Sequence, residues 1–250
     1  MKKSILICFL IFTHFTFSQF DNKSIENLAV EFINTLSPDL KNRTIFNLET
    51  SERTKFYFVP IERKGTSFKD FDKYQKKAAL KLLRASLSKK GYNKSEKIRQ
   101  LEKVLLKIEI PRLVFKGKEI IRDYLDYHFW LFGVPSKDSL WGWKFEGHHV
   151  SFNFTLKNNK IISSTPSFLG ANPAVVNIEG FKKLQVLKSE MNLGSRLVSS
   201  FSIKQNKTAQ FSKNAPIDII TKNNFKAQKI SPLGINYNEL NSLQKKVFLK

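Results

Sequence analysis

The segment from residue 141 to 155, WGWKFEGHHVSFNFT, carries the side chains best suited to chemistry in this chain. It contains two of the three tryptophans and two of the four histidines. Imidazole, carboxylate, hydroxyl and indole groups at this density are typical of a binding or catalytic site. We therefore take this segment as the candidate site, and three kinds of chemistry compete for it.

The first hypothesis is a metal site. His148 and His149 would be ligands of a divalent transition metal, with Glu146 and, more weakly, His128 completing the set. Imidazole and carboxylate groups suit zinc, copper or iron, and a bound metal lowers the pKa of its water. His149 is the first choice of ligand. The Glu-x-His spacing is common by chance, so it is not diagnostic.

The second hypothesis is nucleophilic catalysis, in which His149 activates Ser151 two residues along the same strand. Such a pair needs the two side chains within hydrogen-bonding reach and a third group that orients the base. The signal is weak because the sequence has no Gly-x-Ser-x-Gly turn.

The third hypothesis is a stacking platform for a glycan or another flat ligand. Trp141 and Trp143 would provide the platform, with Ser151, Asn153 and Asn172 as hydrogen-bonding partners. The structural alternative is that the aromatic residues belong to the core and that the histidines are hydrogen-bonded inside it.

Alternation over residues 144–156 predicts one strand with a polar and an apolar face. His149, Ser151 and Asn153 would lie on the polar face, and His148 on the apolar one. Adjacent histidines in a strand point to opposite sides, so they could share a metal only if a bulge near Gly147 altered the alternation.

The elements around this strand predict an α+β fold, a mostly antiparallel sheet with a helical hairpin and further amphipathic helices packed on it. A capping box at Ser67–Asp70 would open the hairpin. We expect helices over 22–37, 68–91, 95–110, 181–201 and 238–250, strands within 46–59, 123–131, 161–165 and 217–221, a hairpin turn at 157–160, and a loop over 165–176.

Residues 1–18 are predicted to be a signal peptide cleaved before Gln19, because two lysines precede a short apolar run that ends in small residues. The protein would then be secreted or periplasmic, with no transmembrane segment after cleavage. The single cysteine, Cys8, lies within the leader, so the mature chain would have no disulfide.

The formal net charge is +22. In a cytoplasmic protein such a charge would first suggest nucleic acid. With an export signal and no dense basic block, it favours an anionic envelope surface or glycan instead, and no nucleic acid. The simplest alternative is that lysines are scattered over solvated faces.

Several landmarks together resemble the bacterial family called domain of unknown function 3500. They are Arg63-Lys64-Gly65, the Phe71–Gln75 helix, Phe132-Gly133-x-Pro135-Ser136, Trp141-Gly142-Trp143, Glu146-Gly147-His148-His149-x-Ser151-x-Asn153-Phe154-Thr155 and Phe168-Leu169-Gly170-Ala171-Asn172-Pro173-Ala174. The resemblance covers roughly residues 40–250 and implies one domain over 19–250. Members of that family continue with a second histidine-rich stretch, so the resemblance implies that the C-terminal part of the domain is missing here.

Two functions follow as hypotheses. The first is an exported protein with a metal or ligand pocket around His148, His149 and Glu146, carrying out metal-dependent hydrolytic or oxidative chemistry. The alternative is a non-enzymatic periplasmic or extracellular binding protein for a glycan or anionic ligand, using Trp141, Trp143 and the basic surface.

Overall fold

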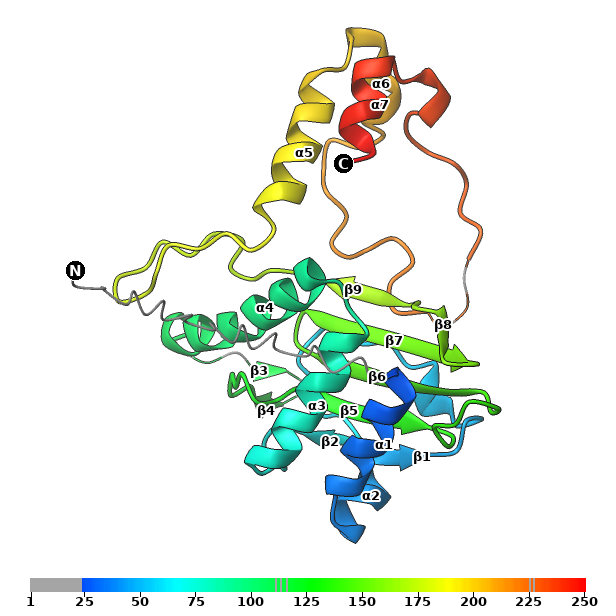
Figure 1. Cartoon of the computed structure of the whole chain (residues 1–250). Coiled ribbons are helices and arrows are strands. Elements are labelled where there is room, and N and C mark those ends of the chain that lie inside the picture. Colours follow the sequence, from blue (N-terminus) through cyan, green and yellow to red (C-terminus); the bar gives the residue numbers. More distant parts are fainter. Residues whose placement is uncertain (1–23, 111, 113, 116, 225, 227) are drawn as a thin grey trace, which may run out of the picture.

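The computed structural model describes residues 24–250 except 111, 113, 116, 225 and 227. The predicted signal peptide lies outside the described residues. An α/β body over residues 24–187 carries a mixed sheet with helices against it, and three helices in residues 188–250 stand away from the body (Figure 1).

Within the described residues, a seven-stranded sheet has the order β1-β5-β6-β7-β8, with β2 also paired to β5 and β9 to β7. All of its pairings are antiparallel except that of β1 with β5, which confirms the predicted α+β class. The strands are β1 Ile45–Phe46, β2 Thr66–Ser67, β5 His128–Phe132, β6 Trp141–Gly147, β7 Val150–Lys157, β8 Lys160–Ser163 and β9 Ser167–Leu169, and a separate ribbon pairs β3 Val114–Phe115 with β4 Lys118–Glu119.

Helices cover one face of this sheet (Figure 1). They are α1 Ile25–Thr35, α2 Pro38–Thr44, α3 Lys73–Ala85 and α4 Lys89–Ile108. The capping box that opens α3 is formed by Asp72 and Gln75 and lies five residues after the predicted Ser67–Asp70 box. Asp70 instead accepts hydrogen bonds from the backbone and hydroxyl of Ser67, so that pair closes a turn. The α3 and α4 helices are consecutive as predicted, but α3 packs mainly along α1.

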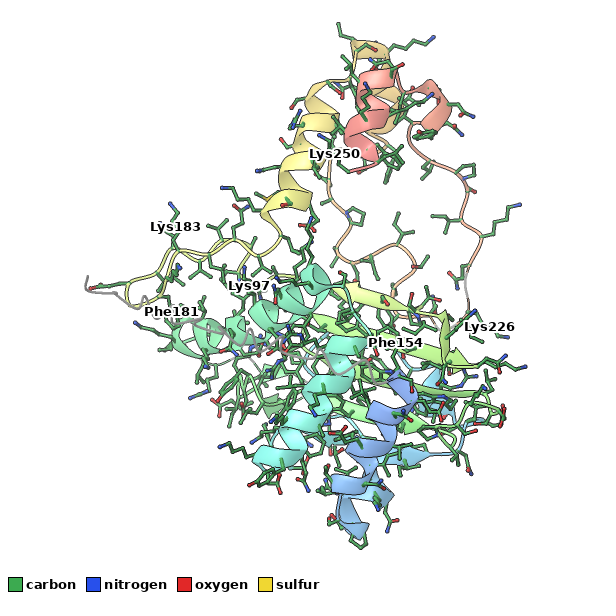
Figure 2. All side chains as sticks on the ribbon, in the orientation of Figure 1. Lys97, Phe154, Phe181, Lys183, Lys226 and Lys250 are labelled. Carbon is green, nitrogen blue, oxygen red and sulfur yellow. The ribbon has the colours of Figure 1, made fainter. Side chains whose placement is uncertain are left out.

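The core lies between these helices and the aromatic face of β5–β7. Trp143 pairs with Phe154 and Phe145 with Phe152 across β6 and β7, so these four side chains share one face. That face packs against Phe32 of α1 and other helix residues, and all belong to one buried apolar cluster. Each buried aromatic ring removes a large apolar area from water, so the core fixes β6 and β7 firmly. Figure 2 shows side chains densely packed between helices and sheet.

The predicted continuous strand over 144–156 is wrong, because β6 and β7 form a hairpin with His148 and His149 as its turn. The two-residue turn places Gly147 opposite Val150. Phe145 therefore shares a face with Phe152, whereas a continuous strand would place it on the same face as Ser151. The second hairpin confirms the turn predicted at 157–160. Asn158 and Asn159 both have positive φ there, as this tight turn requires.

Several other predicted boundaries are wrong. Where strands were expected, residues 47–59 contain a 3₁₀ turn at Ser51–Arg53 and irregular backbone, and residues 123–127 contain a turn and irregular backbone. Residues 217–221 form no strand, and the predicted loop contains β9. The polar face of the sheet explains the first difference. Lys144 donates hydrogen bonds to the carbonyls of Glu52 and Lys55, so this irregular segment satisfies sheet side chains and does not extend the sheet.

The C-terminal helices are α5 Lys188–Ser199, α6 Ile203–Ala209 and α7 Ser242–Phe248, with a 3₁₀ turn at Tyr237–Glu239. The predicted helix over 181–201 is therefore seven residues shorter at its start, and the last predicted helix begins at Ser242. No helix in the described part of the chain is both long and apolar enough to cross a membrane.

We expect Gly147→Ala to lower the free energy of unfolding by about 1–3 kcal/mol, as overpacking of a core does. A Cβ at residue 147 would lie 2.3 Å from a ring carbon of Tyr127. Gly194→Ala is the matched control, because a Cβ in that helix meets nothing within 4 Å and alanine favours the helix by roughly 0.5–1 kcal/mol. Urea unfolding of both variants tests this, and an unchanged midpoint for Gly147→Ala would contradict it.

Candidate functional site

The turn between β6 and β7 brings the two adjacent histidines together. Their ring centroids are 4.1 Å apart, so the prediction that they point to opposite sides is wrong. His149 has a φ of 58°, a left-handed conformation that residues other than glycine seldom adopt. Backbone strain of this kind often accompanies a functional constraint.

Neighbouring segments hold this strained turn in place. The Tyr127 hydroxyl donates to the carbonyl of His148 at 2.7 Å. The His149 amide donates to the carbonyl of Phe58 at 2.9 Å, and the Gly170 amide donates to the carbonyl of His149 at 2.8 Å. Three segments far apart in sequence therefore fix the turn backbone, and with it the ring of His148.

The buried partner of His148 is Glu102 on α4. Its Oε1 lies 2.5 Å from Nδ1 of His148, and both side chains are almost fully buried. Arg122 approaches the same nitrogen, with Nη1 3.3 Å from Nδ1. Glu109 holds Arg122 through two hydrogen bonds of 2.7 and 2.8 Å, a bidentate pair that fixes the guanidinium plane.

One hydrogen lies between Nδ1 of His148 and Oε1 of Glu102, and either atom can carry it. When the carboxyl group is protonated, Nδ1 accepts its hydrogen bond and the neutral imidazole carries its own hydrogen on Nε2. When the carboxyl group is ionised, the ring hydrogen can lie on Nδ1 instead, and Nε2 then has a free lone pair.

The pKa values of these groups determine which of the two states is populated. Burial raises the pKa of Glu102 to about 7, against a smaller lowering by Arg122. Burial, with Arg122 next in size, lowers the pKa of His148 to about 3. Burial and the neighbouring His148 lower the pKa of His149 to about 4. Both rings are therefore neutral at pH 7, while the carboxyl group of Glu102 gains or loses its proton near this pH.

A small polar cavity of about 20 Å³ adjoins this pair, which is room for about one water molecule. Its charged and polar lining includes Arg63, Glu102, Arg122, Tyr127 and His148. We call this cavity the chamber. Such a concentration of titratable groups around a water-sized space is a feature of catalytic sites.

A larger cleft of about 500 Å³ lies beside the chamber, within the usual size range for small-molecule sites. The chamber and the cleft have Pro60, Ile120, Ile121 and Asp126 in common. Tyr57, Ile61, Glu62, Lys118 and Glu119 complete the lining of the cleft. A ligand in this mainly apolar cleft would lie next to the chamber.

Glu146 lies in a second buried network and not in the predicted histidine site. Its oxygens accept hydrogen bonds from Arg63 Nε at 3.1 Å, the Tyr57 amide at 3.0 Å and the Ser151 hydroxyl at 2.9 Å. Arg63 also donates to the carbonyls of residues 57, 59 and 61. The carboxylate is thus occupied in holding the irregular segment on the sheet.

The predicted serine–histidine pair is not formed, since the Ser151 hydroxyl donates to Glu146. His128 pairs with Asp126 at 3.1 Å. Among the residues that the structure describes, no three histidine, cysteine, aspartate or glutamate side chains converge in a way that could hold a metal ion. Of the four predicted ligands, His148 is paired with Glu102, Glu146 with Arg63 and His128 with Asp126, while the ring of His149 lies against that of His148.

The predicted stacking platform is also wrong. Trp141 and Trp143 are 0% and 1% exposed because they lie on the core face of β6. Asn153 is buried and donates to the carbonyl of Pro166. Asn172 is exposed in the loop after β9. The aromatic residues are therefore core, as the structural alternative predicted.

Sequence reasoning missed Glu102, Arg122 and Tyr127. One signal was available for Glu102, which lies on the apolar face of α4 between Ile98 and Leu105. A carboxylate at such a position is rarely buried without a partner. No comparable pattern pointed to Arg122.

Comparison with known proteins assigns the chain to a family. Residues 19–250 match the family described as protein of unknown function (DUF3500). The chain therefore belongs to this family, which confirms the resemblance found in the sequence. No curated protein and no solved structure matches the chain.

The pH dependence of stability tests the proton on Glu102. Its folded pKa of about 7 lies above the ordinary 4.5, so the folded protein holds the proton more tightly than the unfolded chain. This contribution is complete below about pH 4.5 and is lost as the pH rises through 7. Glu102→Gln keeps a hydrogen-bond donor but cannot ionise.

Wild type should lose about 2 kcal/mol of unfolding free energy between pH 5 and pH 8 that Glu102→Gln does not lose. The stability of the variant relative to wild type should therefore rise by that amount. Urea unfolding at both pH values measures the gain. Glu49→Gln, at an exposed position, is the control and should show no such change. An equal difference from wild type at both pH values for Glu102→Gln would show that the carboxyl is not protonated in the folded state.

Proposed function

We propose that this protein is a hydrolytic enzyme in which Glu102 and His148 act together as a general acid–base pair on a small molecule bound in the cleft. The observation that carries the proposal is the 2.5 Å contact between Glu102 Oε1 and His148 Nδ1 beside a water-sized chamber. The pKa of Glu102 is about 7, so its charge changes near the working pH. The negative charge of the ionised carboxylate beside Nδ1 makes Nε2 a stronger base than the pKa of about 3 for His148 implies.

The pair has two useful protonation states. With Glu102 protonated, Nδ1 of His148 accepts the hydrogen bond and Nε2–H is a donor. When Glu102 loses its proton, the ring hydrogen is favoured on Nδ1, where it faces the carboxylate, and Nε2 becomes an acceptor. One nitrogen can therefore serve as acid or base, depending on a single proton.

In the acceptor state, Nε2 takes a proton from a water molecule bound in the chamber, while the oxygen of that water forms a bond to the carbonyl carbon of an ester. The same nitrogen then returns that proton to the alkoxide as the carbon–oxygen bond of the leaving group breaks. The products are an acid and an alcohol, and the pair returns to its starting state. The positive charges of Arg63 and Arg122 at the chamber favour the developing oxyanion.

This mechanism differs from the metal-assisted hypothesis of the sequence. The oxygens of Glu146 are occupied by Arg63, Tyr57 and Ser151, which disfavours this carboxylate as a ligand. The proposal uses only the chain's own proton donors and acceptors. It keeps the hydrolytic class and transfers the role of water activation to His148.

Kinetics with p-nitrophenyl acetate test the proposal. We expect kcat/KM to rise with pH through about 7, because Nε2 must accept a proton. Glu102→Gln and His148→Gln should each lower it by about 100-fold or more, while Glu49→Gln leaves it unchanged. ¹⁵N NMR of the imidazole should show the His148 hydrogen moving from Nε2 to Nδ1 over the same pH range. A ring that keeps its Nε2 hydrogen throughout, or equal rates for wild type and Glu102→Gln, would overturn the mechanism.

We also propose that the protein is exported to the periplasm or beyond and that residues 1–18 are removed. The start of the family match at residue 19 supports this boundary. Expression of the whole chain in a bacterial host, followed by intact-mass measurement of the exported protein, should give a chain that begins at Gln19. Recovery of the protein only in the cytoplasm with residues 1–18 attached would contradict export.

A further inference from the structure

The three C-terminal helices lack the apolar core that holds the α/β body together. Neither α5 nor α6 has a buried residue, and the buried residue of α7 is Gln244. Thirteen of the 25 large apolar side chains that are exposed in the described chain lie in residues 188–250. A surface with this much exposed apolar area usually has a partner.

Polar side chains hold these helices to one another. The amides of Gln205 and Gln244 donate to each other at 2.9 and 3.0 Å, and Gln244 also donates to the carbonyl of Ser200 at 2.9 Å. Lys94 and Glu190 form an ion pair that links α5 to α4. Among the described residues of this unit, Leu240 is the one large apolar side chain that is buried, so most of its apolar side chains face outward.

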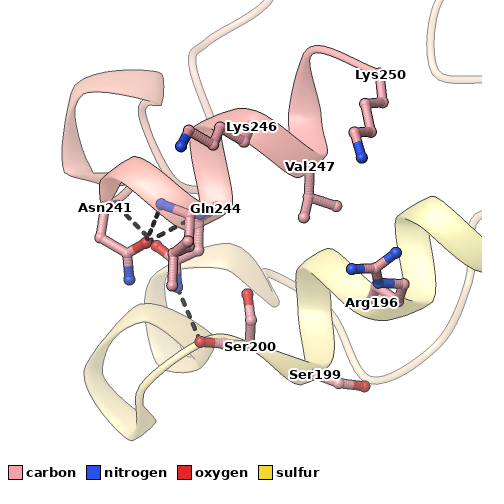
Figure 3. A pocket seen from close by; sticks show the side chains of 9 residues that line it. Arg196, Ser199, Ser200, Asn241, Gln244, Lys246, Val247 and Lys250 are labelled. Atoms are coloured by element: carbon pink, nitrogen blue, oxygen red, sulfur yellow. Dashed lines mark hydrogen bonds between the residues drawn. The ribbon is translucent and has the colours of Figure 1, made fainter.

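A groove of about 630 Å³ runs between α5 and α7. Leu243 and Val247 line it together with Arg196, Lys246 and Lys250 (Figure 3). In the part of the chain that the structure describes, these three cations form no salt bridge with an acidic side chain. Apolar and cationic groups thus occupy the same surface.

The charge of this unit selects the kind of partner. Residues 188–250 contain 11 lysines and arginines and 3 acidic residues, a net charge of 11 − 3 = +8. A second copy of the same surface would be repelled by this charge. The exposed apolar side chains are spread over three short helices and the segments between them, which suits a deformable surface better than one preformed protein face.

We propose that residues 188–250 dock on the surface of an anionic phospholipid bilayer. Exposed side chains such as Leu243 and Leu249 enter the boundary between headgroups and acyl chains, and lysines such as Lys246 and Lys250 contact the lipid phosphates. Short helices with an apolar side and a lysine-rich side bind membrane interfaces in this way, and anionic lipids attract each basic residue near the surface.

Co-sedimentation of the exported protein, residues 19–250, with vesicles tests the proposal. We expect binding to phosphatidylcholine vesicles that contain phosphatidylglycerol, little binding to phosphatidylcholine alone, and release by salt. Lys246→Gln/Lys250→Gln should weaken binding by about tenfold. Leu243→Ser/Leu249→Ser should also weaken binding. Because both side chains are more than 70% exposed, their replacement should not disturb folding.

Matched variants on the α/β body provide the controls. Lys89→Gln/Lys90→Gln removes two adjacent exposed lysines at the start of α4, and Val134→Ser replaces an exposed apolar residue. Both should bind vesicles as wild type does, and circular dichroism should give the same helix content for all variants. Equal binding to neutral vesicles, no binding to either kind, or the same loss in the controls would overturn the proposal. A stable dimer abolished by Leu243→Ser/Leu249→Ser would overturn it in favour of a second copy as the partner.

Discussion

The short hydrogen bond between Glu102 and Nδ1 of His148 sets the condition that the surrounding structure must meet. Both side chains are nearly removed from water, and a buried unpaired charge is very costly. A neutral acid facing a neutral ring avoids that cost, because one proton satisfies two buried polar groups. Each nearby arginine is paired with a carboxylate, Arg122 with Glu109 and Arg63 with Glu146.

The aromatic sheet makes this arrangement possible by fixing the positions of β6 and β7. Rings of Trp143, Phe145, Phe152 and Phe154 lie on one face of the hairpin and pack under the helices. A rigid hairpin can hold a strained turn such as that at His149, since the surrounding packing and hydrogen bonds determine its conformation. The polar face of the same strands binds the irregular segment that forms part of the chamber wall.

The two parts of the chain are stabilised by different forces. The α/β body buries aromatic and aliphatic side chains from helices and strands in a common cluster, which is the dominant source of stability in folded domains. The C-terminal helices are held by amide hydrogen bonds whose net contributions are modest. This difference explains why the body can position a buried proton while the helices keep their apolar side chains exposed.

The sequence alone determined the α+β class, the second hairpin turn, the existence of α1, α3, α4, α5 and α7, and membership of the DUF3500 family. These features depend on local periodicity, on turn residues such as Asn158 and Asn159, and on a specific string of landmarks. The sequence also singled out the segment that contains His148, around which the candidate site is built. It assigned the wrong partners, because an alternating pattern cannot reveal that two residues within it form a turn.

Only the tertiary structure decided what His148 touches. Glu102, Arg122 and Tyr127 are 46, 26 and 21 residues away from it, and such contacts arise from the packing of whole elements. The burial of Trp141 and Trp143 likewise depends on which face of the sheet the helices cover. Local rules specify periodicity and turns over a few residues, whereas a buried site is formed by side chains that meet after the chain has folded.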